Sequence, residues 1–233
     1  MISQRIKELK NLFNKENIDG YVIPKNDEFF SEFSKIDRLK IISNFSGSAG
    51  YAVILKNKNY LFVDGRYTIQ AQIESGKNFI ITEYHKIVNC NLFKNLTLGI
   101  NPKLFTSNQI KKKFLKNNKI KLIKTDLIKQ NSEKKLNDLR PFFSLDKLIV
   151  GQSHKKKINK IIDFLKKNKS NFIFITAPEN VAWLLNIRGY DNPNSPIPNC
   201  HLLLDSKKNL YLIVNKEKAK NLIKENKIKS HQI

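Results

Sequence analysis

Apolar residues along the chain follow two spacings. Between residues 2 and 13 they recur every three or four positions, which predicts an opening helix with one apolar face that ends by Gly20. Residues 21–24, 51–55 and 60–63 are short, nearly continuous apolar runs, and such runs are typical of buried strands. The polar stretch 56–59 between the last two runs predicts a hairpin.

The residues after this hairpin predict a return to helix. Asp64 can cap a helix over residues 67–75, Gly65 can adopt an unusual backbone angle, and Arg66 then lies at the corner between strand and helix. Further apolar runs predict strands over three segments, which are 79–82, 96–100 and 121–123. Thr106 and Ser107 precede a basic segment and predict a capped helix, because the glycine spacing of a phosphate-binding loop is missing.

The second part of the chain repeats the order helix, strand, helix, hairpin. A polar stretch over 131–140 with few apolar anchors marks the predicted boundary. After it we expect elements over 153–169, 172–176, 181–185, 201–204 and 210–214, and a basic helix over 216–233. The alternation predicts an α/β fold of two domains, residues 1–135 and 145–233, each a mixed sheet flanked by helices. The second ends without a closing strand, which leaves open whether it is incomplete.

Two sequence blocks carry a family resemblance. The loop FSGSAG at 45–50, the hairpin and DGRY at 64–67 are one block, and APENVAWLLNIRG at 177–189 with DNPNSP at 191–196 is the other. Together they resemble the amino-terminal domains of aminopeptidase P, the Xaa-Pro aminopeptidase of the creatinase and prolidase group. The resemblance implies two creatinase amino-terminal-like domains. At the position of residues 26–33 it implies a polar, partly exposed helix.

The resemblance also implies a function. The intact family removes an amino-terminal residue that precedes proline, using a carboxy-terminal domain in which two aspartates, one histidine and two glutamates hold two metal ions, usually manganese. These 233 residues contain no counterpart of that domain. We therefore expect a non-catalytic amino-terminal part that serves dimerisation and active-site capping, with no cofactor of its own. Its expected partners are a second copy or a separate carboxy-terminal peptidase domain, and proline-containing peptides.

An alternative function stays open, as does the status of the chain as an enzyme. The chain can be a truncated relic, or a free-standing protein-binding or oligomerisation module without peptidase activity. For the capping role the resemblance points to Arg66, Tyr67 and Arg188. Arg66 would donate to substrate carbonyls or a carboxylate, and its other interpretation is a structural salt bridge to Asp64 or a helix end. Arg188 lies in a turn expected to face the family's remaining domain.

No catalytic or metal-binding set is predicted within the chain. Its four histidines, His85, His154, His201 and His231, are isolated in sequence, and the serines of the FSGSAG loop do not form a G-x-S-x-G elbow. The neighbouring acids Asp27 and Glu28 resemble a catalytic pair, but we favour a capped surface helix there. Trp183 is expected in the core. Cys90 and Cys200 are expected to be buried or incidental thiols.

The charge of the chain changes this interpretation little. The formal net charge is +23, but 38 of the 43 basic residues are lysines spread along the chain, so we expect no specific nucleic-acid partner. No apolar run reaches the roughly 20 residues needed to span a membrane. The charged start is unlike a signal peptide. A cytoplasmic location is therefore expected.

Overall fold

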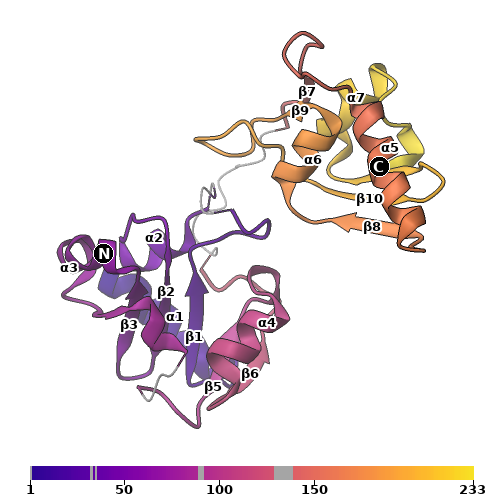
Figure 1. Ribbon diagram of the computed structural model, residues 1–233. Coiled ribbons are helices and arrows are strands. Elements are labelled where there is room, and N and C mark those ends of the chain that lie inside the picture. Colours follow the sequence, from indigo (N-terminus) through magenta and orange to yellow (C-terminus); the bar gives the residue numbers. More distant parts are fainter. Residues whose placement is uncertain (1, 32–33, 35, 89–91, 129–138) are drawn as a thin grey trace. The chain divides into compact units, whose positions relative to one another are not determined.

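The structure is a computed structural model that describes residues 2–31, 34, 36–88, 92–128 and 139–233. It divides into two compact units, residues 1–135 (unit 1) and 136–233 (unit 2), each of which is described by itself (Figure 1). Most of the predicted boundary segment, 131–140, lies outside the described residues.

Unit 1 contains a six-stranded mixed sheet with the order β4-β3-β2-β1-β5-β6. Strand β2 runs antiparallel to both of its neighbours, whereas the pairs β3–β4, β1–β5 and β5–β6 are parallel. The predicted hairpin is confirmed as β2 and β3. The strand bounds are β1 Gly20–Pro24, β2 Gly50–Leu55, β3 Asn59–Val63, β4 Ile80–Glu83, β5 Thr97–Ile100 and β6 Lys119–Leu122.

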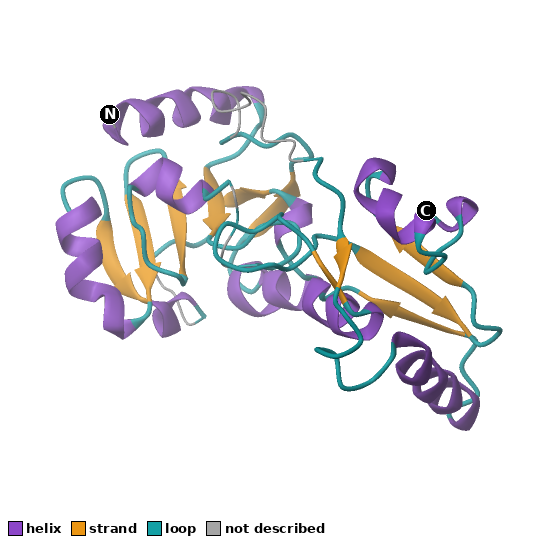
Figure 2. Cartoon of the chain, turned by 90° about the horizontal axis from the view of Figure 1, so that it is seen from above, coloured by secondary structure: helices purple, strands orange, loops and turns teal. Residues whose placement is uncertain are grey.

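Both faces of this sheet are covered (Figure 2). On the first face, buried side chains of β1–β3 pack against α1 (Ile2–Lys15), α2 (Arg38–Ser43) and α3 (Thr68–Ser75). On the second face, the alternate side chains of the same strands pack against side chains from residues 84–88 and 92–115, which include α4 (Ser107–Ile110). Alternate apolar side chains of each strand therefore face opposite layers, because successive side chains of a strand point to opposite faces of the sheet.

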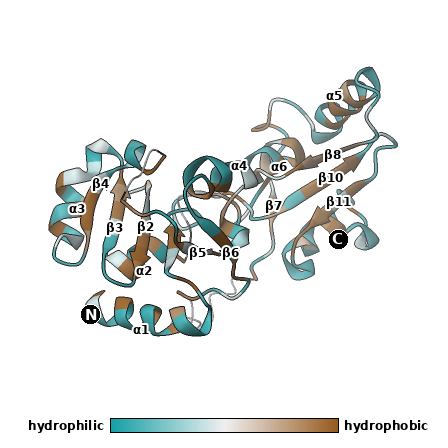
Figure 3. Cartoon of the chain, turned by 90° about the horizontal axis from the view of Figure 1, so that it is seen from below, coloured by the Kyte–Doolittle hydropathy of each residue, from teal (hydrophilic) through white to brown (hydrophobic). Residues whose placement is uncertain are grey.

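Unit 2 has a narrower sheet with the order β11-β10-β8, and its described pairings are all antiparallel. A mixed sheet, predicted for both domains, is therefore seen in unit 1 alone. Helices α5, α6 and α7 pack on one face of the apolar strands, which Figure 3 shows largely in brown. The remaining pair is β7–β9. The bounds are β7 Phe143–Ser144, α5 His154–Lys167, β8 Phe172–Ile175, α6 Pro178–Leu185, β9 Ile187–Arg188, β10 His201–Asp205, β11 Leu210–Ile213 and α7 Lys220–Lys224.

Two predicted helices are wrong. Residues 26–31, the described start of the segment expected to be a polar helix, form a turn in which the Asp27 carboxylate accepts hydrogen bonds from the backbone N–H of Phe29 and Ser31, each at 2.9 Å. This local bonding competes with a helix. The final segment forms short helical pieces, and α7 ends just before Asn226, whose φ is 53°. A left-handed residue at that position stops the helix.

The buried thiol of Cys200 gives a testable prediction. Burial raises the pKa of this thiol to about 12, so the reactive thiolate is scarce at neutral pH. In a Cys90→Ser variant we expect almost no reaction of the folded chain with a thiol-specific disulfide reagent, and one equivalent after unfolding in guanidinium. Circular dichroism checks that the substitution leaves the fold unchanged. Rapid labelling of this folded variant without denaturant would contradict the burial of Cys200 in the core.

Candidate functional site

The topology of unit 1 gathers polar loops at one edge of its sheet. Because β2 is antiparallel to both neighbours, β1 and β3 run in the same direction, and their parallel partners share it. Their carboxyl ends therefore lie together beside the start of β2. At this edge are residues 25–27, the FSGSAG loop and the DGRY corner. Open α/β sheets bind ligands outside the carboxyl ends of their strands, so this edge is the candidate site.

The FSGSAG loop is held by close packing and by hydrogen bonds. A Cβ atom at Gly50 would lie 2.8 Å from the backbone oxygen of Phe62, so only glycine fits there without movement of the strand. The hydroxyl of Ser46 donates to Glu74 at 2.7 Å, and its backbone N–H donates to the same carboxylate at 2.8 Å. Burial raises the pKa of Glu74, but hydrogen bonds from Ser46 and Gln70 outweigh it and lower the pKa overall. These contacts hold the FSGSAG loop in one conformation.

The DGRY corner holds the two candidate capping residues of unit 1. The Asp64 carboxylate accepts from the backbone N–H of Arg66 at 3.0 Å and from its Nε at 2.9 Å, which confirms Asp64 as a cap. It caps a 3₁₀ turn that leads into α3. Gly65 does not take a positive φ, so the conformational freedom of glycine is not used at this position. The hydrogen bonds from Arg66 lower the pKa of Asp64.

The side chains of Arg66 and Tyr67 differ in their exposure to solvent. The Arg66 side chain is 75% exposed despite its ion pair with Asp64, and its guanidinium carbon lies 5.5 Å from the centre of the Tyr67 ring. Tyr67 is partly buried, and its hydroxyl shares a 3.0 Å hydrogen bond with Ser48 of the FSGSAG loop. The tyrosine therefore ties the two loops together, while the guanidinium points into solvent.

A pocket of about 420 Å³ lies at this edge. Its wall includes Asn26, Ser48, Asp64 and the rings of Tyr51 and Tyr84. The Lys113 ammonium is 4.5 Å from the centre of the Tyr51 ring and 4.2 Å from that of Tyr84, and it donates to both hydroxyls. Burial is the largest cause of a raised pKa at Tyr51, so this phenol keeps its proton. The pocket wall thus combines hydroxyls, an amide and aromatic rings.

The acids Asp27 and Glu28 have structural roles instead of forming a catalytic pair. Glu28 pairs at 2.5 Å with Arg38, whose guanidinium is also bound by Asp126 at 2.6 Å. The Arg38 side chain is 2% exposed, which makes it the most deeply buried cation of unit 1 that the structure describes. Burial raises the pKa of Asp27, and hydrogen bonds from two backbone N–H groups offset part of this rise. Nothing in the spacing of the sequence pointed to Arg38.

Arg188, the third candidate, belongs to unit 2. It lies in β9, opposite Phe143 of β7, and its Nη1 donates to the carbonyl of Ile187 at 2.8 Å. The following loop is fixed by Asp191, which accepts from the backbone N–H of Asn199 at 2.6 Å and pairs with Lys218. The turn is therefore held in place, and Arg188 is partly exposed.

The placement of Trp183 in the core is wrong, because its side chain is 58% exposed. Its neighbour Lys157 is buried instead, with the ammonium 4.2 Å from the centre of the indole ring. Lys157 also donates to the carbonyl of Trp183 at 2.7 Å and to Asn186 at 2.6 Å. Burial lowers the pKa of this lysine. The cluster locks α5 to the end of α6.

The histidines, cysteines and acids of the described residues form no group of three that could hold a metal ion. His85 pairs with Glu83 on an exposed surface, and His201 contacts the carbonyl of Thr176 at 2.9 Å. No described helix is long and apolar enough to cross a membrane. The described part of the chain thus forms two α/β units, and unit 1 presents hydrogen-bonding loops and the exposed side chain of Arg66.

Comparison with known protein families agrees with this architecture. The family described as "Creatinase/Prolidase N-terminal domain" matches residues 5–129, and a second family of the same description matches residues 133–233. The chain belongs to the creatinase/prolidase N-terminal domain family. The fold class predicted from the sequence, two α/β domains of this type, is confirmed.

Individual proteins similar to this chain are named as Xaa-Pro or X-prolyl aminopeptidases. A "Probable Xaa-Pro aminopeptidase P" of Coprinopsis cinerea is 33% identical over 211 residues, which are 84% of this chain and 34% of the relative. "Xaa-Pro aminopeptidase 1" of Dictyostelium discoideum is 27% identical, over 96% of this chain and 39% of the relative. A crystal structure of the X-prolyl aminopeptidase of Caenorhabditis elegans, described as a cytosolic enzyme with a di-nuclear active site, shares the fold with a TM-score of 0.85 and 24% identity. It is matched over 98% of this chain and 42% of its own. The chain thus spans about a third of the length of the Coprinopsis cinerea relative and about two fifths of that of the Dictyostelium discoideum relative.

Proposed function

We propose that the chain is the non-catalytic amino-terminal part of a Xaa-Pro aminopeptidase-like protein, and that it serves dimerisation and active-site capping. In this role Arg66, Tyr67 and Arg188 contact the peptide substrate or the mouth of the active site. The metal ions, manganese or another divalent metal, would be held by the part of the protein that these 233 residues do not represent. The family assignment does not favour the alternative, which is a truncated relic or a free-standing protein-binding or oligomerisation module without peptidase activity.

The exposed guanidinium of Arg66 on a fixed corner is the observation that carries the proposal. A capping residue has to project from the surface and still be held in one orientation. Arg66 meets both conditions, since its side chain is 75% exposed while Asp64 binds both its backbone N–H and its Nε. Arginine is suited to peptide carbonyls and carboxylates because its five N–H donors form a planar fork.

Tyr67 and Arg188 play different parts in the proposal. The hydroxyl of Tyr67 forms a hydrogen bond with Ser48, so this partly buried residue positions the corner. Arg188 is partly exposed beside a loop that Asp191 holds in place, which suits a second contact with the peptide or with the domain that binds it.

The test is an Arg66→Ala substitution in an active protein. A chimera in which this chain replaces the matched 211 residues of the Coprinopsis cinerea relative provides one. We expect the KM for an Xaa-Pro peptide to rise by about tenfold, the effect of losing one hydrogen bond from a charged donor. The dimer fraction, measured by light scattering, should stay the same.

Arg5→Ala is the matched control, because Arg5 is an exposed arginine of α1 that donates to the carbonyl of Ile41 in the same unit. It should leave KM unchanged. An unchanged KM in the Arg66 variant would remove Arg66 from the capping role. A lowered melting temperature together with loss of the dimer would show that Arg66 is structural.

A further inference from the structure

Acidic residues are distributed unevenly along unit 1. Residues 1–83 contain twelve basic and ten acidic residues, so their charges nearly cancel. Residues 84–125 contain ten lysines and neither aspartate nor glutamate. A bias of the whole chain toward lysine does not explain this difference, because the preceding 83 residues carry lysines and acids together. The net positive charge of unit 1 is therefore concentrated in one segment.

Six of these ten lysines lie on one β-α-β unit at an end of the sheet. This unit consists of β5, α4, the helical turn Lys111–Leu115 and β6, and β6 is the last strand in the order of the sheet. The backbone N–H of Lys119 donates to the carbonyl of Leu96 at 2.8 Å, and the Asn118 side chain donates to the carbonyl of Phe114 at 3.2 Å. These bonds join β6 to its neighbours. The six lysines are all exposed, and together they are called the basic end: Lys103, Lys111, Lys112, Lys116, Lys119 and Lys124.

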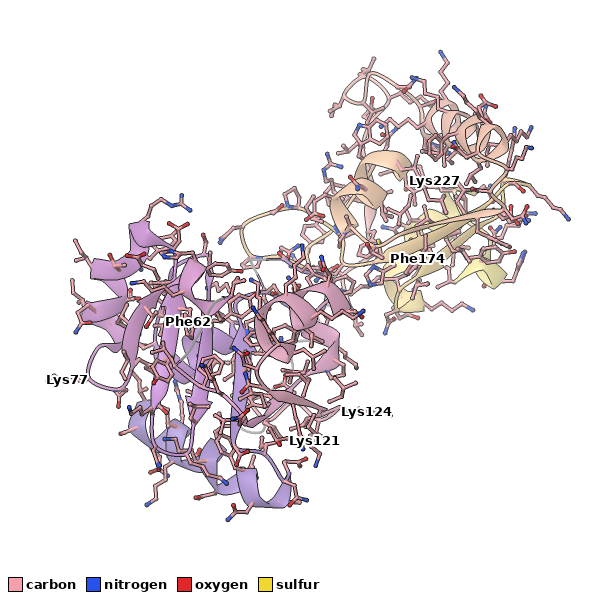
Figure 4. The ribbon with its side chains drawn as sticks, turned by 60° about the horizontal axis from the view of Figure 1, so that its bottom comes forward. Phe62, Lys77, Lys121, Lys124, Phe174 and Lys227 are labelled. Carbon is pink, nitrogen blue, oxygen red and sulfur yellow. The ribbon has the colours of Figure 1, made fainter. Side chains whose placement is uncertain are left out.

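The basic end occupies one side of unit 1. Figure 4 shows Lys121 and Lys124 on one side of this unit and Lys77 on the other side. The order of the sheet agrees, because Lys77 precedes β4 and the other two lysines lie in β6 or just after it, and β4 and β6 are the two end strands. Lys121 itself is half-buried and donates to the carbonyl of Glu16, so it is not counted in the basic end.

The charges of the basic end are not compensated within the described residues. None of its six lysines forms an ion pair with another described residue. Lys112 and Lys116 also lie about one helical turn apart, and like charges at this spacing repel and destabilise a helix. Local conflicts of this kind are expected at functional sites, where a bound partner can offset them. An anion with several charges would relieve the repulsion.

The type of residue in the basic end indicates phosphate groups as the anion. Lysine is depleted in interfaces between proteins, which makes an acidic protein surface a poor match. Clustered lysines on one side of a domain are instead the electrostatic footprint of nucleic acid. The lysine ammonium binds phosphate as a compact point charge and needs no fixed geometry. A backbone of regularly spaced phosphates can therefore neutralise several of these lysines at once.

The aromatic residues of the same segment favour a duplex over a single strand. Tyr84 is partly buried, and the phenylalanines of the segment, Phe93, Phe105 and Phe114, are buried. Proteins bind single strands by stacking the bases on accessible aromatic rings, which the described residues of this segment do not present. The segment also contains no arginine, the residue that most often reads base edges. The phosphates of a duplex lie on its outside and require neither kind of contact.

We propose that the basic end of unit 1 binds the phosphate backbone of double-stranded nucleic acid, independently of its sequence. The lysines contact phosphates and release the counterions that surround them, which is the usual source of such affinity. Because this contact reads no bases, the expectation of no specific nucleic-acid partner is kept. The contact uses neither Arg66 nor Tyr67, so it does not rest on the proposed function.

The test compares two variants of the full chain that carry the same net charge. The first replaces three lysines of the basic end: Lys112→Gln, Lys116→Gln and Lys124→Gln. The second is the matched control and replaces three exposed lysines of residues 1–83: Lys7→Gln, Lys58→Gln and Lys77→Gln. Fluorescence anisotropy measures binding to a short labelled DNA duplex over a range of salt concentrations.

The expected result is a difference in salt dependence. Each lysine on a phosphate contributes about one unit to the slope of log affinity against log salt concentration. The basic-end variant should therefore flatten this slope by about three units, whereas the control should change it by less than about one. Two duplexes of different sequence should bind the unsubstituted chain equally well. Circular dichroism checks that both variants fold.

Four outcomes would overturn the proposal. Equal flattening by both variants would show that the net charge attracts DNA without a particular surface. A strong preference for one duplex sequence would contradict a contact with the backbone. Tighter binding of a single strand, of polyglutamate or of phosphatidylserine vesicles through the same lysines would assign the basic end to another partner. No binding at physiological ionic strength would leave the basic end without this role. The KM test of Arg66 does not involve these lysines, so the two proposals can fail separately.

Discussion

Replacing Arg38 by alanine is expected to lower the free energy of unfolding of unit 1 by about 3–5 kcal/mol, the usual cost of removing one partner of a buried ion pair. The Arg38 side chain is 2% exposed and Asp126 is 12% exposed, so the substitution leaves a carboxylate poorly hydrated and without its cation. It also releases Glu28 from the turn that precedes α2. Chemical denaturation followed by circular dichroism measures the change.

A double-mutant cycle tests the cause of this loss. If the stranded carboxylate is the cost, Arg38→Ala and Asp126→Ala together should destabilise the chain by less than the sum of the single changes. Arg66→Ala serves as the comparison, since the pair formed by Arg66 and Asp64 is exposed and should leave the unfolding midpoint unchanged. Equal midpoints for the Arg38 and Arg66 variants would refute a stabilising role for the buried network.

Local chemistry explains the parts of the fold that the sequence predicted. The β2–β3 hairpin follows from two apolar runs joined by a polar turn, and the DGRY corner follows from the capping chemistry of Asp64. The glycine at position 50 of the FSGSAG loop allows a close backbone approach, because a Cβ atom there would lie 2.8 Å from the backbone oxygen of Phe62. Each of these features depends on residues within about 15 positions of one another, so a pattern can reveal them.

The features that the sequence did not predict depend on distant residues. Arg38 is bound by Asp126, 88 positions away, and no spacing connects them. The predicted burial of Trp183 was wrong for another reason. Helix α6 is apolar over much of its surface, so periodicity does not identify the buried side, and Val181, Leu184 and Leu185 turned out to face the core.

The candidate capping residues stay predictions. The structure brings Arg66 and Tyr67 together at one corner and gives each a distinct environment, but it describes Arg188 in a separate unit. The sequence indicated them by resemblance, whereas the pocket lined by Tyr51 and Tyr84 had no sequence pattern, because its wall combines residues from five separate places along the chain.

The 233-residue chain alone is expected to release no amino-terminal residue from Xaa-Pro peptides, even with added manganese. Metal ions in such reactions activate a water and polarise the carbonyl, contributions worth several kcal/mol, and each 1.4 kcal/mol corresponds to about tenfold in rate. The described histidines and acids form no cluster that could hold such an ion. We therefore expect product at the level of a blank, measured by chromatography over a day, with the chimera as the positive control. Release above the blank that disappears on chelation, and persists after removal of trace peptidases by a second purification, would show that the chain itself contains a metal site.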